Sequence, residues 1–209
     1  SVGGQALTGI HVSAWRDPLG STIITPGEPA LAGELCVSQR HISPRWPNRM
    51  PNAVVVRSFE PADAVAVSSL IAATMRTSNA GDYPADRLEA LIAYFTPGKL
   101  RLLAQERDCL VAVCGGEVMA TAAREGNELA TFFVHPEWQR RGVGTRLLEQ
   151  LERNARKSGV GELRVDASIT GAGFYERHGY QRTGASLAGT AGPQITLTKR
   201  ITEPLANER

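Results

Sequence analysis

The stretch HPEWQRRGVGTRLLEQLE, residues 135–152, places two arginines and two glycines directly before a run with the periodicity of an amphipathic helix. Glycine lets a ligand approach the backbone closely but weakens a helix, so Gly142 and Gly144 at this junction need an explanation. The first N–H groups of a helix lack an intrahelical partner and, with the helix dipole, favour a bound anion. The glycines therefore form a plain turn between a strand and a helix, a cradle for an anion such as pyrophosphate, or both.

Two common nucleotide motifs do not fit this stretch. A Walker loop requires Lys and then Ser or Thr after its second Gly, whereas Gly144 is followed by Thr145 and Arg146. The dinucleotide fingerprint requires a third Gly or Ala at the position that Leu147 occupies. Neither motif therefore explains the two glycines.

The helix that follows the glycines is predicted to be amphipathic, with its charges arranged to suit the helix dipole. Its buried side is formed by apolar residues at helical spacing, Val143, Leu147, Leu148 and Leu151. We expect Glu149 and Glu152 on the solvent side. The basic residues at its C-terminal end complement the dipole there: Arg153, Arg156 and Lys157.

Strands and helices are predicted on both sides of this helix. Upstream, a β-branched strand at 53–59 precedes helical patterns at 60–77, 83–95 and 97–107, and the segment 109–136 reads as three consecutive strands with a hairpin at its Gly-Gly pair. Downstream come a strand near 162–168, a short helix at 171–180 and a last strand at 194–201. The order predicts an α+β fold, with helices around one mostly antiparallel sheet.

Composition gives a second set of limits. Of the 209 residues, 42% are hydrophobic and 21% are charged, which is typical of a soluble protein, and no apolar run approaches the roughly 20 residues of a membrane span. The first ten residues do not resemble a secretory signal, so we expect a cytoplasmic protein without a membrane partner. A net charge of +2 gives no reason to expect a nucleic-acid partner.

The domain organisation is predicted from proline and cysteine placement. Residues 1–52 hold six of the twelve prolines, which favours an extended arm with short strands over long helices, and we assign 53–202 to the main domain and 203–209 to a tail. The arm covers the acceptor cleft, contributes to a homodimer or is a flexible leader. The three cysteines and four histidines match no zinc spacing, so we expect reduced thiols and no metal.

Two separate motifs resemble one family. The segment 139–144, QRRGVG, after a strand and before an amphipathic helix, resembles the acetyl-coenzyme A signature of the GNAT superfamily of N-acetyltransferases. The segment 163–184, LRVDASITGAGFYERHGYQRTG, resembles the second signature of that superfamily, and the likeness covers about 54–201. The resemblance implies a twisted, mostly antiparallel sheet in which the coenzyme lies at a splay between two central strands.

The resemblance also implies a set of site residues. The N–H of Val134 would polarise the thioester carbonyl and stabilise the oxyanion, and Tyr175 would protonate the departing thiolate. The backbone from about Arg140 to Thr145 would hold the pyrophosphate. The full set of residues expected at the coenzyme is Phe133, Val134, Gln139, Arg140, Arg141, Gly142, Val143, Gly144, Thr145, Ser168, Thr170 and Tyr175.

The sequence departs from the family pattern in two places. An asparagine common in the second signature is not evident, because Ser168 and Thr170 occupy its neighbourhood. No general base stands out either; Asp166, Glu128 and His135 are candidates, and each also fits a structural or exposed role. His178 is a further residue that either faces the cleft or lies at the surface.

Three functions follow from these expectations. The first is direct transfer of an acetyl group from acetyl-coenzyme A to a primary amine of a small molecule or protein. The alternative is a non-catalytic acyl-coenzyme A sensor or interaction module with the same fold. A third, an activity directed at nucleic acid, rests only on the mild basicity. The acceptor would be selected by the segments 77–86 and 185–194, in which Asp82, Tyr83 and Asp86 suit a cationic amine.

Overall fold

The computed structural model describes residues 54–186 and 194–202 of the 209-residue chain. The arm expected at 1–52, with its short strands, and the tail expected at 203–209 lie outside the described residues. So does most of the late segment 185–194 that was expected near the acceptor.

One seven-stranded sheet organises the described residues, in the order β1-β2-β3-β4-β5-β7-β6. Neighbouring strands are antiparallel except for the parallel pair β4 and β5. The strands in chain order are β1 (Val55–Ser58), β2 (Asp108–Cys114), β3 (Glu117–Glu125), β4 (Glu128–Val134), β5 (Glu162–Ser168), β6 (Gln181–Ser186) and β7 (Gln194–Arg200). The predicted fold class, helices around a mostly antiparallel sheet, is therefore confirmed.

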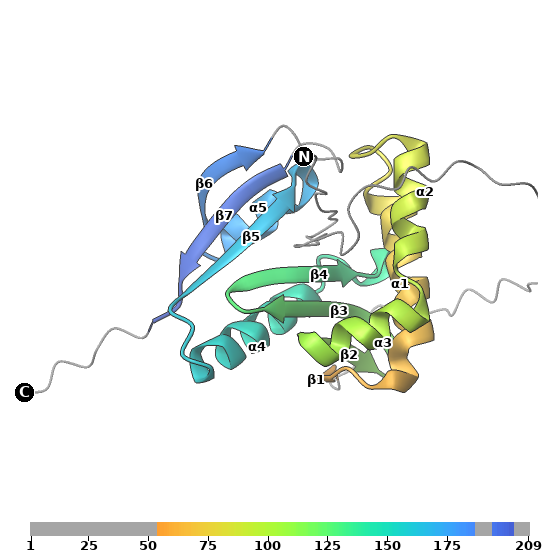
Figure 1. The fold of residues 1–209 in the computed structure, drawn as a ribbon, viewed down its shortest axis with the longest axis horizontal. Helices are drawn as coiled ribbons and strands as arrows, with labels where there is room; N and C mark the ends of the chain where they lie inside the picture. The colour runs from red at the N-terminus through yellow and green to blue at the C-terminus, as the bar shows by residue number, and fades with distance from the viewer. Residues whose placement is uncertain (1–53, 187–193, 203–209) are drawn as a thin grey trace, which may run out of the picture.

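Helices cover both faces of the sheet (Figure 1). The helices are α1 (Ala64–Ser78), α2 (Ala85–Tyr94), α3 (Pro97–Glu106), α4 (Val143–Lys157) and α5 (Ile169–Arg177), with short 3-10 turns η1 (Pro61–Asp63) and η2 (Pro136–Trp138). Two hydrophobic clusters follow from this arrangement, one under α4 and α5 and one under α1 to α3. Successive residues of β4 alternate between them, with Phe132 in the first cluster and Phe133 in the second.

A bulge bends β4 near its middle. The register with β3 passes from Ala123 opposite Ala130 to Thr121 opposite Phe133, so β4 contains one residue more than its partner over this interval. Thr131 has a positive φ of 46°, which a non-glycine residue rarely adopts. The bulge re-aims the last part of β4, the part that ends at the predicted coenzyme loop.

The two halves of the sheet meet at a single pair of residues. Between β4 and β5 the register contains only Glu128 opposite Arg164, beside a backbone bond from the Arg164 N–H to the Asn127 carbonyl of 2.9 Å. Beyond that point the strands diverge, as Figure 1 shows. The splay expected between two central strands is therefore present, and backbone groups along its edges are free of strand pairing.

One prediction about α4 is wrong. Glu152 was expected on the solvent side, but it is only 5% exposed, and its carboxylate accepts bonds of 2.7 and 2.9 Å from the Lys199 ammonium. The guanidinium of Arg156 adds a contact of 3.4 Å. Lys199 belongs to β7, 47 residues from Glu152, so the residue pattern of the helix could not predict this ion pair. The burial of Glu152 is therefore a tertiary effect.

The strand β6 is an element that the sequence pattern did not predict. It forms one edge of the sheet, its first four residues are exposed, and it pairs only with β7. Its sequence, QRTGAS, lacks the apolar alternation from which a half-buried strand is recognised. An exposed edge strand therefore leaves little signal in the sequence.

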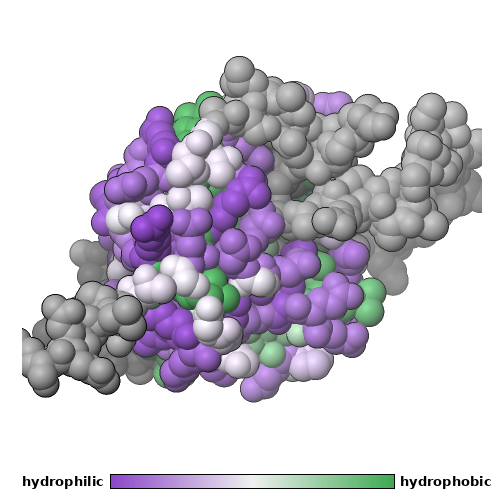
Figure 2. Space-filling view, turned by 60° about the vertical axis from the view of Figure 1, so that its left-hand side comes forward, coloured by the Kyte–Doolittle hydropathy of each residue, from purple (hydrophilic) through white to green (hydrophobic). Residues whose placement is uncertain are grey.

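The described part of the chain has a mostly polar face (Figure 2) and two cysteines that form no disulfide. The face shown in Figure 2 is mostly hydrophilic, with small separate apolar areas. Among the described helices, none has both the length and the apolar character that a membrane span needs. Cys109 and Cys114 are free thiols, and burial raises the pKa of Cys109 to about 11. Burial therefore favours the protonated form of the Cys109 thiol at neutral pH.

Candidate active site

A cavity of about 630 Å³ lies where the C-terminal end of α1, the end of β4, the loop before α4 and the helix α5 come together. Its lining contains polar, basic and aromatic side chains together with exposed backbone. The lining residues are Thr74, Ser78, Asn79, Val134, Gln139, Arg140, Gly142, Gly144, Thr145, Thr170, Gly171, Phe174, Arg177 and His178. The structure thus brings seven of the twelve predicted coenzyme residues to one cavity.

The first turn of α4 opens onto this cavity without a side-chain cap. Gly142 is the N-cap residue, with φ of +79°, and no side-chain cap of the helix is present among residues 54–186 and 194–202. The first hydrogen bond within the helix runs from the Arg146 N–H to the Gly142 carbonyl, 3.1 Å. The N–H groups of Val143, Gly144 and Thr145 precede it, so the helix offers them no acceptor. This end of the cavity can therefore hold an anion.

Gly144 keeps the space in front of those N–H groups open. A Cβ built at this position would lie 3.4 Å from the Phe174 ring and 3.4 Å from a methyl of Val134. That distance is an ordinary van der Waals contact, so the backbone tolerates a side chain, but the side chain would occupy the cavity. Gly142 is different, because a Cβ there meets nothing and only its positive φ favours glycine.

The two arginines of the loop have different positions. Arg140 has a positive φ of 56°, is exposed and lines the cavity. The guanidinium of Arg141 stacks over the Trp138 ring at 5.1 Å, and its side chain is not part of the lining. A third arginine, Arg177 of α5, also lines the cavity and was not predicted. Its signal in the sequence is weak, because a basic residue in the last turn of a helix is common.

The end of β4 has a backbone N–H that does not pair with β3. The His135 N–H donates to the Met119 carbonyl at 2.9 Å, which makes the neighbouring Ala120–Val134 pair a non-hydrogen-bonded pair of the antiparallel ladder. The N–H of Val134 therefore points away from β3, toward the side on which β5 has already diverged. A preorganised donor in that position suits a carbonyl oxygen that gains negative charge.

Side chains brace this segment from two directions. The Val134 carbonyl accepts bonds from Gln139 Nε2 at 3.1 Å and from Thr74 Oγ1 at 3.3 Å. Gln139 Nε2 also donates to Ser78 Oγ at 2.9 Å. Gln139 thus ties β4 to the end of α1. Thr74 and Ser78 line the cavity but were not predicted as site residues. The sequence gives little reason to select them, because a polar residue within an apolar helix face is common.

Of four other predicted residues, three lie outside the cavity lining, Phe133, Val143 and Ser168, and only Thr170 lines it. Phe133 and Val143 are fully buried, and their side chains belong to the two hydrophobic clusters. Ser168 caps α5 by accepting the Gly171 N–H at 3.1 Å. Thr170 is exposed, lines the cavity and donates to Asp82 Oδ1 at 2.9 Å.

Tyr175 lies in the core beside the cavity. It is fully buried, its ring contacts Phe132, Phe174 and Tyr180, and it is not part of the lining. Its hydroxyl has no hydrogen-bond partner among the described residues. Burial raises the pKa of this phenol well above its ordinary value, so the group keeps its proton at neutral pH. Phe174, whose ring centroid lies 5.2 Å from that of Tyr175, does line the cavity.

His178 occupies the same wall as the glycine loop. Its Nδ1 lies 2.8 Å from the Phe174 carbonyl, which can only accept, so Nδ1 carries a proton. Its Nε2 lies 3.0 Å from Thr145 Oγ1, and both residues line the cavity. The contact joins α5 to the first turn of α4.

The three candidate bases have other partners. Asp166 accepts from Arg164 at 2.7 Å and from Thr196 at 2.6 Å, and the Nδ1 of His135 accepts the Glu137 N–H at 3.4 Å. Glu128 lies 3.6 Å from Arg164, and burial raises the pKa of its carboxyl. None of the three is a lining residue of the cavity.

Comparisons with known proteins agree with this geometry. A family model described as "Acetyltransferase (GNAT) domain" matches residues 79–191. The chain is 26% identical over 130 residues to the uncharacterized N-acetyltransferase YafP of Escherichia coli (strain K12), a match that spans 62% of this chain and 83% of that protein.

Solved structures share the fold. A GCN5-related N-acetyltransferase from Rhodopseudomonas palustris is similar with a TM-score of 0.66 and 26% identity, over 74% of this chain and 99% of the other. The PaiA N-acetyltransferase from Thermoplasma acidophilum, solved in complex with coenzyme A, has a TM-score of 0.65 at 18% identity, over 71% and 99%. The family match covers more than half of the chain, and the protein therefore belongs to the GNAT family of acetyltransferases.

Proposed function

We propose that this protein transfers an acetyl group from acetyl-coenzyme A to a primary amine of a small molecule or protein by direct attack. The observation that carries the proposal is one continuous cavity with the uncapped first turn of α4 at one side and the end of β4 at another. The first suits a pyrophosphate and the second suits a thioester carbonyl.

The residues present fit this coenzyme. Gly144 leaves open a space that even a methyl group would reduce, directly in front of unpaired N–H groups. Arg140 and Arg177 bring positive charge to the same cavity, which favours a phosphate group. The hydroxyl of Tyr175 is a buried polar group without a hydrogen-bond partner among the described residues, and such groups in folded proteins call for a ligand or another explanation.

Bound acetyl-coenzyme A would supply an activated acetyl group, whose transfer forms a C–N bond, breaks the C–S bond and releases a thiolate that needs a proton. The Val134 N–H would donate to the acetyl oxygen as negative charge develops there. Tyr175 would hold the proton for the sulfur at its Oη, which burial keeps protonated. The amine must lose its own proton before it attacks, because an ordinary alkylammonium has a pKa of about 10.4.

Titration calorimetry of the folded protein with acetyl-coenzyme A tests the first half of the proposal. We expect saturable binding of one coenzyme per chain, followed by free-thiol release when a panel of amines is added. Absence of binding by a protein with a normal melting transition would refute it. Binding without thiol release across the panel would favour the second candidate.

That second candidate is a coenzyme-binding module without catalysis. The burial of Tyr175 outside the cavity lining favours it, because an acid must reach the sulfur to protonate it. Amine-dependent thiol release that is lost when the cavity is filled at Gly144 would exclude this candidate.

A further inference from the structure

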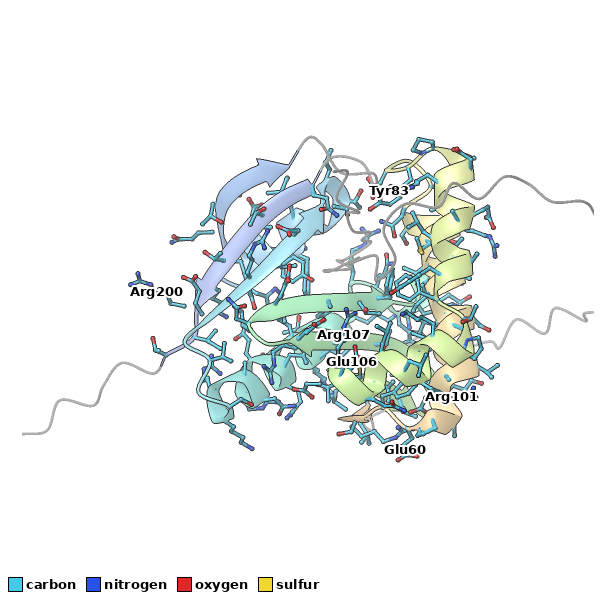
Figure 3. The ribbon with its side chains drawn as sticks, in the orientation of Figure 1. Glu60, Tyr83, Arg101, Glu106, Arg107 and Arg200 are labelled. Carbon is cyan, nitrogen blue, oxygen red and sulfur yellow. The ribbon has the colours of Figure 1, made fainter. Side chains whose placement is uncertain are left out.

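The loop between α1 and α2 crosses to α5 at the edge of the cavity. Asp82 lies in this loop, and its Oδ1 accepts the Thr170 hydroxyl at 2.9 Å while its Oδ2 accepts the Asn79 amide at 2.9 Å. Both donors line the cavity. Tyr83, the next residue in the chain, marks the position of the loop in Figure 3. The carboxylate is therefore joined directly to two residues of the cavity wall.

Asn79 has an acceptor left over. It is fully buried, and its Oδ1 has no hydrogen-bond partner among the described residues. The orientation of the amide follows from Asp82, because a carboxylate only accepts and the Asn79 NH₂ group must face it. A buried carbonyl oxygen on a cavity-lining residue without a donor indicates that a donor arrives with a ligand.

Asp82 is also uncompensated in charge. Six described carboxylates are buried or half-buried: Asp63, Asp82, Asp108, Glu128, Glu152 and Asp166. The other five each have an Arg or Lys nitrogen within 4.0 Å. Asp82 has only the neutral donors Asn79 and Thr170 in the part of the chain that the structure describes. A half-buried negative charge of this kind favours a cationic ligand.

The nitrogen that attacks is not suited to this position. A carboxylate stabilises a protonated amine, whereas the attacking amine must be neutral. A cation held beside Asp82 is therefore a second nitrogen of the acceptor, and the reacting nitrogen lies elsewhere along the same molecule.

We propose that Asn79 and Asp82 bind a protonated nitrogen of the acceptor, and that the acceptor is a diamine whose other nitrogen receives the acetyl group. This inference rests on the proposed acetyltransferase function. Asn79 Oδ1 accepts one N–H of the cation. Asp82 supplies the charge and fixes the amide of Asn79, so it is a specificity-determining residue.

A structural role for Asp82 makes a different prediction. If the carboxylate only ties the loop to α5, its removal lowers the melting temperature and weakens the binding of diamines and monoamines by the same factor. If it binds a cation, its removal changes the preference for a diamine over a monoamine of equal length. The ratio of the two affinities therefore separates the two roles.

The experiment measures binding of linear diamines and matching monoamines, such as diaminobutane and butylamine, to protein saturated with coenzyme A, by calorimetry. Wild-type protein is expected to bind the best diamine at least about tenfold more tightly than its monoamine, as for a hydrogen bond to a charged group. Asp82→Asn and Asn79→Leu are each expected to reduce this ratio to about one, with coenzyme A affinity unchanged. Glu106→Gln is the control, because it removes an exposed carboxylate of α3 outside the cavity lining.

The outcomes separate this inference from the proposed function. If coenzyme A does not bind, the proposed function fails and this inference falls with it. If coenzyme A binds and wild-type protein shows no diamine preference, only this inference is overturned, whatever the variants do. A preference that survives in Asp82→Asn overturns it equally.

Discussion

The cavity is built in two different ways at its two ends. At the α4 end the chain contributes mainly backbone, with Gly142 and Gly144 exposing N–H groups and Arg140 adding positive charge. At the α1–α2 loop the chain contributes side-chain acceptors, the oxygens of Asn79 and Asp82. The first end is suited to an anion and the second to a cation. One cavity can therefore hold two substrates of opposite charge, each at its own end.

The largest expected effect comes from filling the α4 end. In Gly144→Trp the indole would occupy the space beside Phe174 and Val134, and we expect acetyl-coenzyme A affinity to fall by at least about a thousandfold, roughly 4 kcal/mol. Calorimetry measures the loss, and thermal unfolding shows whether the fold is retained.

The matched control for this variant is Gly98→Trp. Gly98 lies in α3, and a Cβ there meets nothing within 4 Å. This variant is expected to bind the coenzyme normally. Equal losses in both variants would mean that added tryptophan, and not the filled cavity, is responsible.

A smaller effect is expected when the phenol beside the cavity is removed. Tyr175→Phe should lower amine-dependent thiol release by about a hundredfold, the scale of a general acid, and leave coenzyme affinity unchanged. The melting temperature should stay the same or rise, because the lost hydroxyl has no partner in the described structure.

Tyr180→Phe provides the comparison for that variant. Tyr180 is also buried, and its ring centroid lies 5.4 Å from that of Tyr175. The two variants therefore remove the same group from similar surroundings. Turnover should be retained in this variant. A Tyr175→Phe protein with unchanged turnover would remove the phenol from the mechanism and leave it as core.

The sequence predicted the α4 end of the cavity better than the loop end, and the reason is physical. A backbone anion site needs glycines at fixed positions before a periodic helix, and both features are local in the chain. The Asp82 carboxylate is joined to the cavity wall on α5 by Thr170, which is 88 residues away in the chain. No spacing rule within the loop records that contact.

The same distinction explains the fold. The hairpin at Gly115 and Gly116 and the amphipathic α4 were predictable, because turn chemistry and periodicity are local. The burial of Glu152 depends on Lys199, and the edge strand β6 depends on pairing with β7. Features decided by distant partners are the ones that the sequence pattern missed.

The two glycines should differ in what a methyl group does. Gly144→Ala places a Cβ in ordinary contact with Phe174 and Val134, so it should weaken coenzyme binding by about tenfold, roughly 1.4 kcal/mol, with little loss of stability. Gly142→Ala meets no atom but forces alanine to a φ of +79°, and should cost about 1 kcal/mol of unfolding free energy. Parallel calorimetry and denaturant unfolding of both variants measure the contrast. If Gly144→Ala lowers only stability, the plain turn is the correct interpretation of that glycine.

The smallest expected effect separates the two neighbouring arginines. Arg140 lines the cavity, whereas Arg141 stacks on Trp138 beside it. Arg140→Ala should weaken coenzyme binding by about threefold to tenfold at low salt and by less at high salt, because an exposed charge is screened. Arg141→Ala should change the affinity by less than about twofold, since its guanidinium interacts with an aromatic face and not with the ligand. Titrations of both variants at two salt concentrations give the answer. Equal, salt-dependent losses would show that both side chains reach the phosphates, and Arg141 would then join Arg140 and Arg177 as a source of positive charge for the coenzyme.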